Sequence, residues 1–139
     1  MKIEEIERSL PNGLHDSRLT KLHIDYTNRE CILVLSIDIS ETKYNNIHKH
    51  NYRQGMLKFN DIIFCVIEPP YILDFDNSNL WIADTGLVDI SNIYSSNAPE
   101  HFPKNAFIYY LFINNWNAFI YISALNVSFE WLCSESIIT

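Results

Sequence analysis

Residues 106–124, AFIYYLFINNWNAFIYISA, decide the fold class. Two runs rich in aromatic and β-branched residues, 106–113 and 118–124, flank the polar segment 114–117. Such residues favour β-strands, and a short polar loop between two strands is typical of a hairpin. The stretch therefore predicts two antiparallel strands. Residues 127–131 then alternate apolar and polar side chains, which predicts a final strand.

A second hairpin is predicted near the N-terminus. Apolar residues recur with a period of two in 20–26 and again in 31–39, and the polar segment 27–30 has the length of a hairpin loop. Residues 2–10 instead place Ile and Leu three and four apart, which predicts a short amphipathic helix. The turn residues 11–13 end it.

The middle of the chain gives weaker signals. Residues 55–59 and 62–67 predict two strands, and because 62–67 is apolar on both faces we expect it in a central position. Residues 40–54 are polar and predict a long connection or an exposed edge. Within residues 71–103, a short strand is expected at 80–83 and a strand or a helical turn at 86–93. The rest is rich in Asn, Ser, Asp and Pro, which favours loops.

These segments predict seven or eight strands in one domain spanning residues 1–139. The fold expected is mainly β, an antiparallel sandwich or a partly closed barrel with a short N-terminal helix. Apolar residues make up 47% of the chain and aromatic residues 14%, which is enough to build a core.

The charge limits the classes of partner. The net charge is −7, and the 10 Lys and Arg residues are scattered. Binding to nucleic acid or to an anionic membrane relies on clustered Lys and Arg, so we expect neither. The acidity either favours a basic protein partner or serves only to keep the protein soluble. The N-terminus lacks the apolar region of a signal peptide, and no apolar run is long enough for a membrane helix, which predicts a cytoplasmic protein.

The cysteines give no sign of a disulfide framework or a zinc cluster. There are three, Cys31, Cys65 and Cys133, and none forms a CxxC pair. Cys31 and Cys65 lie in apolar stretches and are expected to be small core residues. Motifs for a nucleophilic serine or a glycine-rich phosphate loop are also missing, so no cofactor is predicted.

The pair His15-Asp16 is the first candidate for chemistry. A histidine beside a carboxylate acts as an acid–base unit if both side chains converge on a substrate. The alternative is that Asp16 shapes the turn and His15 is hydrogen-bonded structurally, because adjacent side chains rarely point the same way. With Arg18, these residues form a candidate functional surface.

Two further patterns suggest binding. His48 and His50 have the spacing that places two imidazoles on one face of a strand, but no carboxylate follows and the only later histidine is in a proline-flanked loop. A metal site is therefore disfavoured. Trp116 lies among asparagines in a predicted turn, where it either anchors a partner or folds back over its hairpin.

The segments GLHDSRL at 13–19 and YRQGMLKFNDIIFCVIEPP at 52–70, together with the final step Phe129-Glu130-Trp131, carry a resemblance. The chain resembles a group of small uncharacterised bacterial all-β proteins, some of which are similar to predicted immunity proteins of toxin systems. The resemblance implies a role in protein binding and no catalytic residues.

Three functions follow as hypotheses. The first is a non-catalytic interaction protein, such as an immunity-type inhibitor of a basic toxin. The second is a β-barrel that binds a small ligand among its aromatic strands. The third is an enzyme, either metal-dependent or using His15 and Asp16 for acid–base chemistry. The sequence favours the first and leaves the oligomeric state open.

Overall fold

The computed structural model describes residues 2–40, 51–73, 79–90, 92, 102–132 and 137–138. This part of the chain forms one short helix and ten strands. They are α1 (Ile3–Ser9), β1 (Pro11–Leu14), β2 (Arg18–Asp25), β3 (Glu30–Asp38), β4 (Asn51–Asn60), β5 (Phe64–Ile67), β6 (Leu80–Leu87), β7 (Phe107–Ile113), β8 (Ala118–Ala124), β9 (Asn126–Trp131) and β10 (Ile137–Ile138). The fold is mainly β with a short N-terminal helix, as the sequence predicts.

Nine of the described strands form a single antiparallel sheet. Its order is β10-β4-β3-β2-β6-β7-β8-β5, and β9 also pairs with β4. Both hairpins expected from the sequence are present, β2 with β3 and β7 with β8. The sheet is not closed, since within the described residues β5 pairs only with β8.

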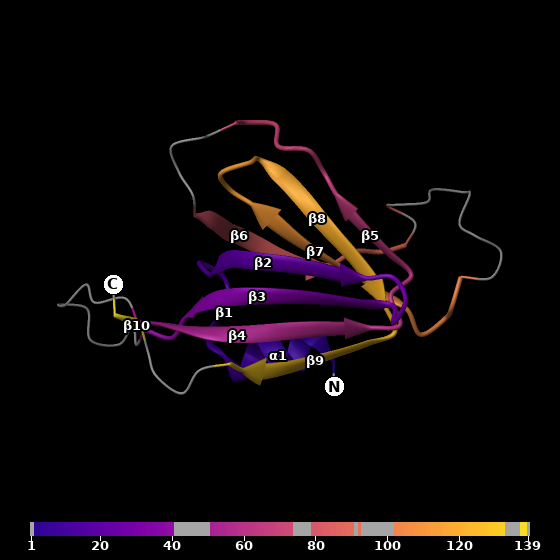
Figure 1. Cartoon of the computed structure of the whole chain (residues 1–139), viewed down its shortest axis with the longest axis horizontal. Helices are drawn as coiled ribbons and strands as arrows, with labels where there is room; N and C mark the ends of the chain where they lie inside the picture. The colour runs from indigo at the N-terminus through magenta and orange to yellow at the C-terminus, as the bar shows by residue number, and fades with distance from the viewer. Residues whose placement is uncertain are drawn as a thin grey trace.

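The sheet bends sharply between β2 and β6. These strands pair only through Arg18↔Trp81 and Leu19↔Leu80, so they separate after a short contact. This short β2–β6 pairing, which we call the joint, divides the sheet into two halves. The first half contains β2, β3, β4, β9 and β10, and the second half contains β6, β7, β8 and β5. The strands of the second half run obliquely to those of the first (Figure 1).

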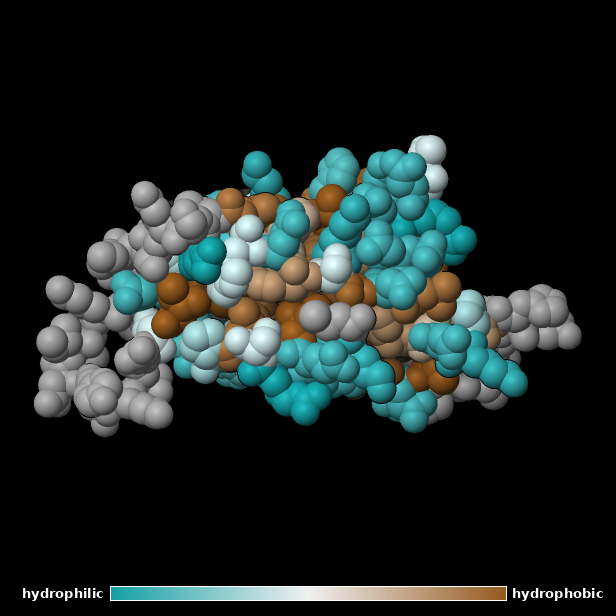
Figure 2. All heavy atoms as spheres, turned by 90° about the horizontal axis from the view of Figure 1, so that it is seen from below, coloured by the Kyte–Doolittle hydropathy of each residue, from teal (hydrophilic) through white to brown (hydrophobic). Residues whose placement is uncertain are grey.

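The core lies between the inner faces of the two halves. The ring of Phe59, on β4, lies 6.1 Å from that of Phe107 and 6.0 Å from that of Tyr109, both on β7. Helix α1 buries Ile3 and Ile6 in the same core. Beside it, apolar residues run along the middle of this side of the molecule between polar margins (Figure 2).

A polar contact ties the helix to the second half. The carboxylate of Glu7 accepts hydrogen bonds from the Tyr109 hydroxyl at 2.7 Å and from the Thr85 hydroxyl at 2.5 Å. Because α1 also contacts β9, it bridges the two halves across the bend.

Two expectations are corrected. Residues 51–54 belong to β4 rather than to a connection, because Tyr52 pairs with Asp38 on β3 and is buried. Residues 62–67 do not form a central strand: β5 begins at Phe64 and lies at the edge of the sheet. Val66, which points outward from β5, is apolar but exposed. Apolar residues on both faces of this segment therefore did not mean that both faces are buried.

Glycine at position 55 is required by close packing. A Cβ atom there would come within 2.6 Å of the Phe129 ring and 2.8 Å of Ile37 Cδ1, both on the core side. We expect Gly55→Ala to lower the free energy of unfolding by about 1–3 kcal/mol, measured by urea unfolding. Gly86→Ala is the matched control: its Cβ would meet the Tyr110 ring at 2.8 Å, but that ring lies on the half-exposed outer face, where a shift costs less than in the core. An equal or larger loss for Gly86→Ala would contradict this packing.

Candidate interaction surface

The outer side of the second half carries a continuous group of aromatic rings. The register pairs Tyr110 with Tyr121 and Phe112 with Phe119, so all four side chains lie on the same side of β7 and β8. The intervening residues, such as Leu111 and Ile120, point into the core. We call Tyr110, Phe112, Phe119 and Tyr121 the aromatic face.

Phe119 is the centre of this group. Its ring centroid lies 4.8 Å from that of Phe112, 5.5 Å from that of Tyr121 and 5.7 Å from that of Tyr110. All four side chains are half-buried. Rigid aromatic side chains that are held in place lose little conformational freedom on binding, which suits an interface.

Carboxylates border the aromatic face on both sides. Asp84, on β6, accepts a hydrogen bond from the Tyr110 hydroxyl at 2.9 Å, and this bond, with burial, raises the pKa of Tyr110. Glu68, just after β5, accepts one from the Phe119 backbone N–H at 2.7 Å. Burial and then the charge of Glu68 raise the pKa of Tyr121. Strands β5, β6, β7 and β8 contain no Lys or Arg, so no cation on these strands offsets the two carboxylates.

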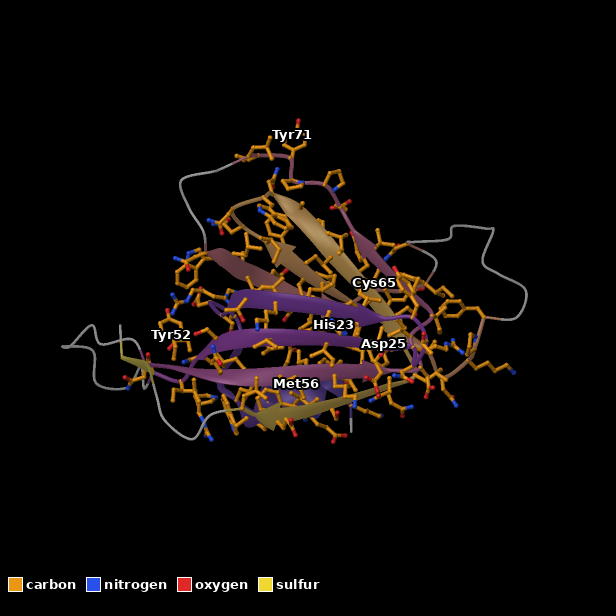
Figure 3. The ribbon with its side chains drawn as sticks, in the orientation of Figure 1. His23, Asp25, Tyr52, Met56, Cys65 and Tyr71 are labelled. Carbon is orange, nitrogen blue, oxygen red and sulfur yellow. The ribbon has the colours of Figure 1, made fainter. Side chains whose placement is uncertain are left out.

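Exposed apolar side chains extend this surface toward the edge of the sheet. Val66, on β5, is 45% exposed and lies opposite Tyr121. Beyond β5, Tyr71 is 83% exposed and projects away from the body of the protein (Figure 3). Ile72 and Leu73 are exposed beside it. The backbone N–H groups of Tyr71 and Ile72 donate to the carbonyl oxygen of Trp116, which fixes this segment to the β7–β8 turn.

The outer side of the first half is different in character. His23 and Met56 lie on it (Figure 3), where apolar residues such as Ile32 and Val34 mix with charged ones such as Lys21 and Glu130. Lys58 forms an ion pair with Glu30 at 3.3 Å. Such a mixed surface is ordinary for a sheet face in contact with water. The aromatic face is therefore the unusual surface of this sheet.

The sequence candidates His15, Asp16 and Arg18 lie at the end of the sheet where β2 meets β6. His15 Nδ1 is 3.8 Å from Asp16 Oδ1, longer than a hydrogen bond, and the side chains are 58% and 73% exposed. Asp16 has a φ of 61° and its N–H donates to the Ile82 carbonyl, so it shapes the turn. The Arg18 guanidinium lies over the rings of Tyr52, at 4.5 Å, and Trp81, at 5.3 Å. It is held in place by cation–π contacts.

Trp116 folds back over its own hairpin rather than projecting into solvent. Its side chain is half-buried and packs against the core. It lies in the β7–β8 turn. In the same turn, the side-chain oxygen of Asn115 accepts a hydrogen bond from the backbone N–H of Trp81 at 2.9 Å. The four candidates thus gather near the start of β6. His48 and His50 lie outside the described residues.

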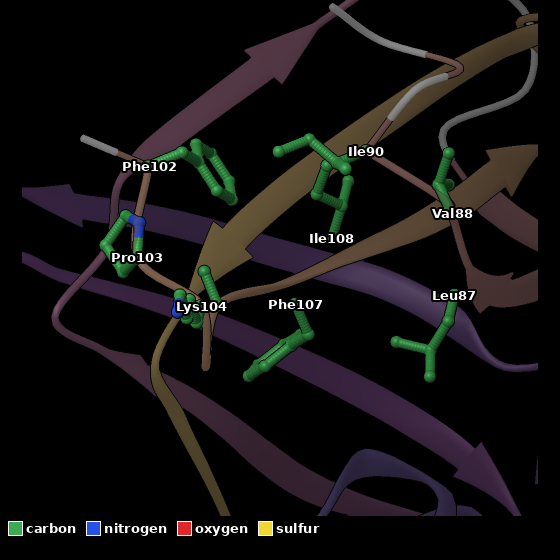
Figure 4. Close-up of a pocket in the computed structure, with 9 residues that line it drawn as sticks. Leu87, Val88, Ile90, Phe102, Pro103, Lys104, Phe107 and Ile108 are labelled. Atoms are coloured by element: carbon green, nitrogen blue, oxygen red, sulfur yellow. The ribbon is translucent and has the colours of Figure 1, made fainter. Parts of the chain in front are cut away.

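The second half also borders a largely apolar cavity of about 430 Å³. Leu87, Val88, Ile90, Phe102 and Ile108 are among the residues that line it (Figure 4). The described residues contain no group of three or more His, Cys, Asp or Glu side chains placed to hold a metal ion. Among the described residues, no helix combines the length and apolar character needed to cross a membrane.

No protein-family model and no curated protein matches this chain. It is similar to the crystal structure of an uncharacterized protein from Neisseria gonorrhoeae. The two chains are 16% identical and superpose with a TM-score of 0.50 over 84% of this chain and 91% of that one. This likeness concerns the fold alone.

Sequence reasoning did not find the aromatic face. The period-two pattern of 110, 112, 119 and 121 groups these residues on one side of their strands. The other side is equally apolar, however, and that pattern is also typical of strands buried on both faces. The signal that could have separated the cases is that 110, 112, 119 and 121 are all aromatic, whereas the other side mixes Phe107 and Tyr109 with Leu, Ile and Ala.

Tyrosine burial predicts a loss of stability in alkali. The pKa values of Tyr52, Tyr109, Tyr110 and Tyr121 are all raised, mainly by burial except at Tyr110, where the bond to Asp84 dominates. Above about pH 10 the unfolded chain loses phenol protons that the folded protein retains. We therefore expect the free energy of unfolding to fall as the pH rises above 10, measured by urea unfolding with absorbance at 295 nm. Tyr109→Phe should make the fall less steep; an unchanged slope would contradict its contribution.

Proposed function

We propose that this protein is a non-catalytic interaction protein that binds a basic protein partner through the aromatic face. The observation that carries the proposal is the combination of four contacting rings with carboxylates at both margins. Aromatic side chains supply most of the binding energy in many interfaces, and charged margins steer the partner and fix its orientation.

Charge favours a basic partner over a second copy of this chain. Two copies would bring Asp84 and Glu68 of each chain close together, and each copy carries a net charge of −7. Like charges across an interface are unfavourable. Single-stranded nucleic acid also stacks on aromatic rings, but it needs a positively charged groove. The strands of the second half provide no such charge.

The concrete form of this proposal is an immunity-type inhibitor of a bacterial toxin, acting in the cytoplasm. An inhibitor of this kind needs a complementary surface and no catalytic group. The acidic character of the chain supports this form, as does its resemblance to small bacterial all-β proteins of which some are similar to predicted immunity proteins.

Co-expression with the product of a neighbouring gene tests the proposal. We expect a complex that survives purification at low salt, weakens as the salt concentration rises, and protects cells from that product. A neighbouring product that neither binds nor harms unprotected cells would argue against the immunity form. Binding that is insensitive to salt would argue against a basic partner.

The apolar cavity supports a second candidate function, the binding of a small apolar ligand. Its size falls within the range of small-molecule sites. A ligand bound there should raise the melting temperature of the protein, and replacing Ile108 with a larger Phe should abolish the rise. The acid–base hypothesis gains no comparable support, because His15 and Asp16 are exposed and not hydrogen-bonded to each other.

A further inference from the structure

Two cysteines far apart in the sequence meet between the halves of the sheet. Cys31 lies on β3, fully buried, with Ile24 and Phe59 as its neighbours on adjacent strands. Cys65 lies on the edge strand β5 and packs against the core that contains Cys31. Figure 3 labels Cys65 at the β5 side of the second half. Both cysteines belong to the same layer of the core. Cys65 pairs with Ile122, which pairs with Tyr109, and the Tyr109 ring lies 6.0 Å from that of Phe59, the partner of Cys31.

Neighbouring bonds hold the two cysteines in register. The Ile62 N–H donates to the carbonyl oxygen of Arg29 at 3.1 Å, and the Arg29 guanidinium donates back to the Ile62 carbonyl at 3.0 Å. Arg29 precedes Cys31 by two positions and Ile62 precedes Cys65 by three. The hairpin loop before β3 is thus fastened to the turn before β5.

The two thiols differ in accessibility and acidity. Cys65 is half-buried and lines a cavity of about 300 Å³ with Tyr26, Arg29 and Phe64, through which a small reagent can reach it. The neighbouring Cys31 thiol lowers the pKa of Cys65. The Cys65 thiol and then burial raise the pKa of Cys31. Cys65 is therefore the attacking thiol and Cys31 the resolving one.

We propose that Cys31 and Cys65 form a reactive dithiol that closes reversibly into a disulfide, linking the edge strand β5 to β3. With a small aliphatic disulfide as oxidant, the Cys65 thiolate attacks one sulfur and releases the first thiolate, which takes up a proton. Cys31 then loses its proton and attacks the Cys65 sulfur, which expels the second small thiol. Two cysteine thiols are oxidised, and one small disulfide is reduced to two thiols.

The test uses the full-length protein with Cys133→Ala, which leaves only the two cysteines in question. After incubation with oxidised glutathione in native buffer, we expect a mass loss of two hydrogens and no thiol open to alkylation. A digest should contain a peptide that links residues 31 and 65. Reduction should restore both thiols. The closed form should melt roughly 5–10 °C higher, because the bond restricts the unfolded chain.

Two comparisons show whether the native fold brings the thiols together. Ring closure after the first exchange should be at least about tenfold faster in native buffer than in urea, because the fold raises the effective concentration of Cys31. Equal rates would overturn the proposal, as would a lasting glutathione adduct on Cys65 or two unreacted thiols. Cys65→Ser should leave Cys31 unmodified. In the unsubstituted protein, a disulfide to Cys133 in place of the 31–65 link would also count against it.

Discussion

Phe59→Ala is expected to lower the free energy of unfolding by about 3–5 kcal/mol. Phe59 is fully buried on β4, and its ring contacts those of Phe107 and Tyr109 on β7. The two halves pair through few backbone bonds at the β2–β6 joint, so side-chain packing between inner faces holds them together. Removing this ring opens a cavity between the halves. Urea unfolding followed by tryptophan fluorescence measures the loss.

Phe112→Ala is the matched control for the inner and outer faces. It removes the same group from the aromatic face, where the ring is half-buried and already partly hydrated. We expect it to cost about 1 kcal/mol or less. Equal losses for the two variants would contradict the assignment of Phe112 to the outer side of the sheet.

The elements that could be predicted from the sequence are those with local signals. The hairpin formed by β7 and β8 combines β-favouring residues with a polar turn, in which Asn117 has a φ of 50°. The helix at the N-terminus and the β2–β3 hairpin likewise show clear periods. These features depend only on neighbours in the chain, so a periodic pattern was sufficient.

The parts that could not be predicted depend on distant partners. The polar residues 51–54 join the sheet because β3 supplies a pairing strand, which a local pattern does not reveal. The position of β5 at an edge follows from the strand order, and so does the meeting of Cys31 with Cys65. Period two shows which residues share a face. It does not show whether another part of the chain covers that face.

The candidate site illustrates the same limit. His15 and Asp16 attracted attention because adjacent residues with complementary chemistry are visible in a sequence, yet the structure places them in an exposed turn. Arg18 is held over two rings from other strands, and Trp116 packs against the core. Tyr110 and Phe119 come from different strands, and their shared surface exists only once β7 and β8 are paired.

Phe119→Ala is expected to weaken the complex with a basic partner by at least about 100-fold, or about 3 kcal/mol. Its ring contacts the other three rings of the aromatic face. Its loss therefore also removes the contact that holds those three rings in place. The effect should lie mainly in a faster dissociation rate, measured by surface plasmon resonance. Asp84→Asn should instead slow association at low salt, because it removes a charge at the margin.

Met56→Ala provides the control on the opposite outer surface. Met56 is half-buried on β4 in the first half, so the substitution also removes an apolar side chain from a sheet face. We expect its affinity for the partner to stay within about twofold of the original, since surface changes away from an interface have small effects. If Met56→Ala weakened binding as much as Phe119→Ala, the partner would not be binding specifically through the aromatic face. If neither changed it, the contact would lie elsewhere, and the exposed segment that contains Tyr71 would be the next surface to substitute.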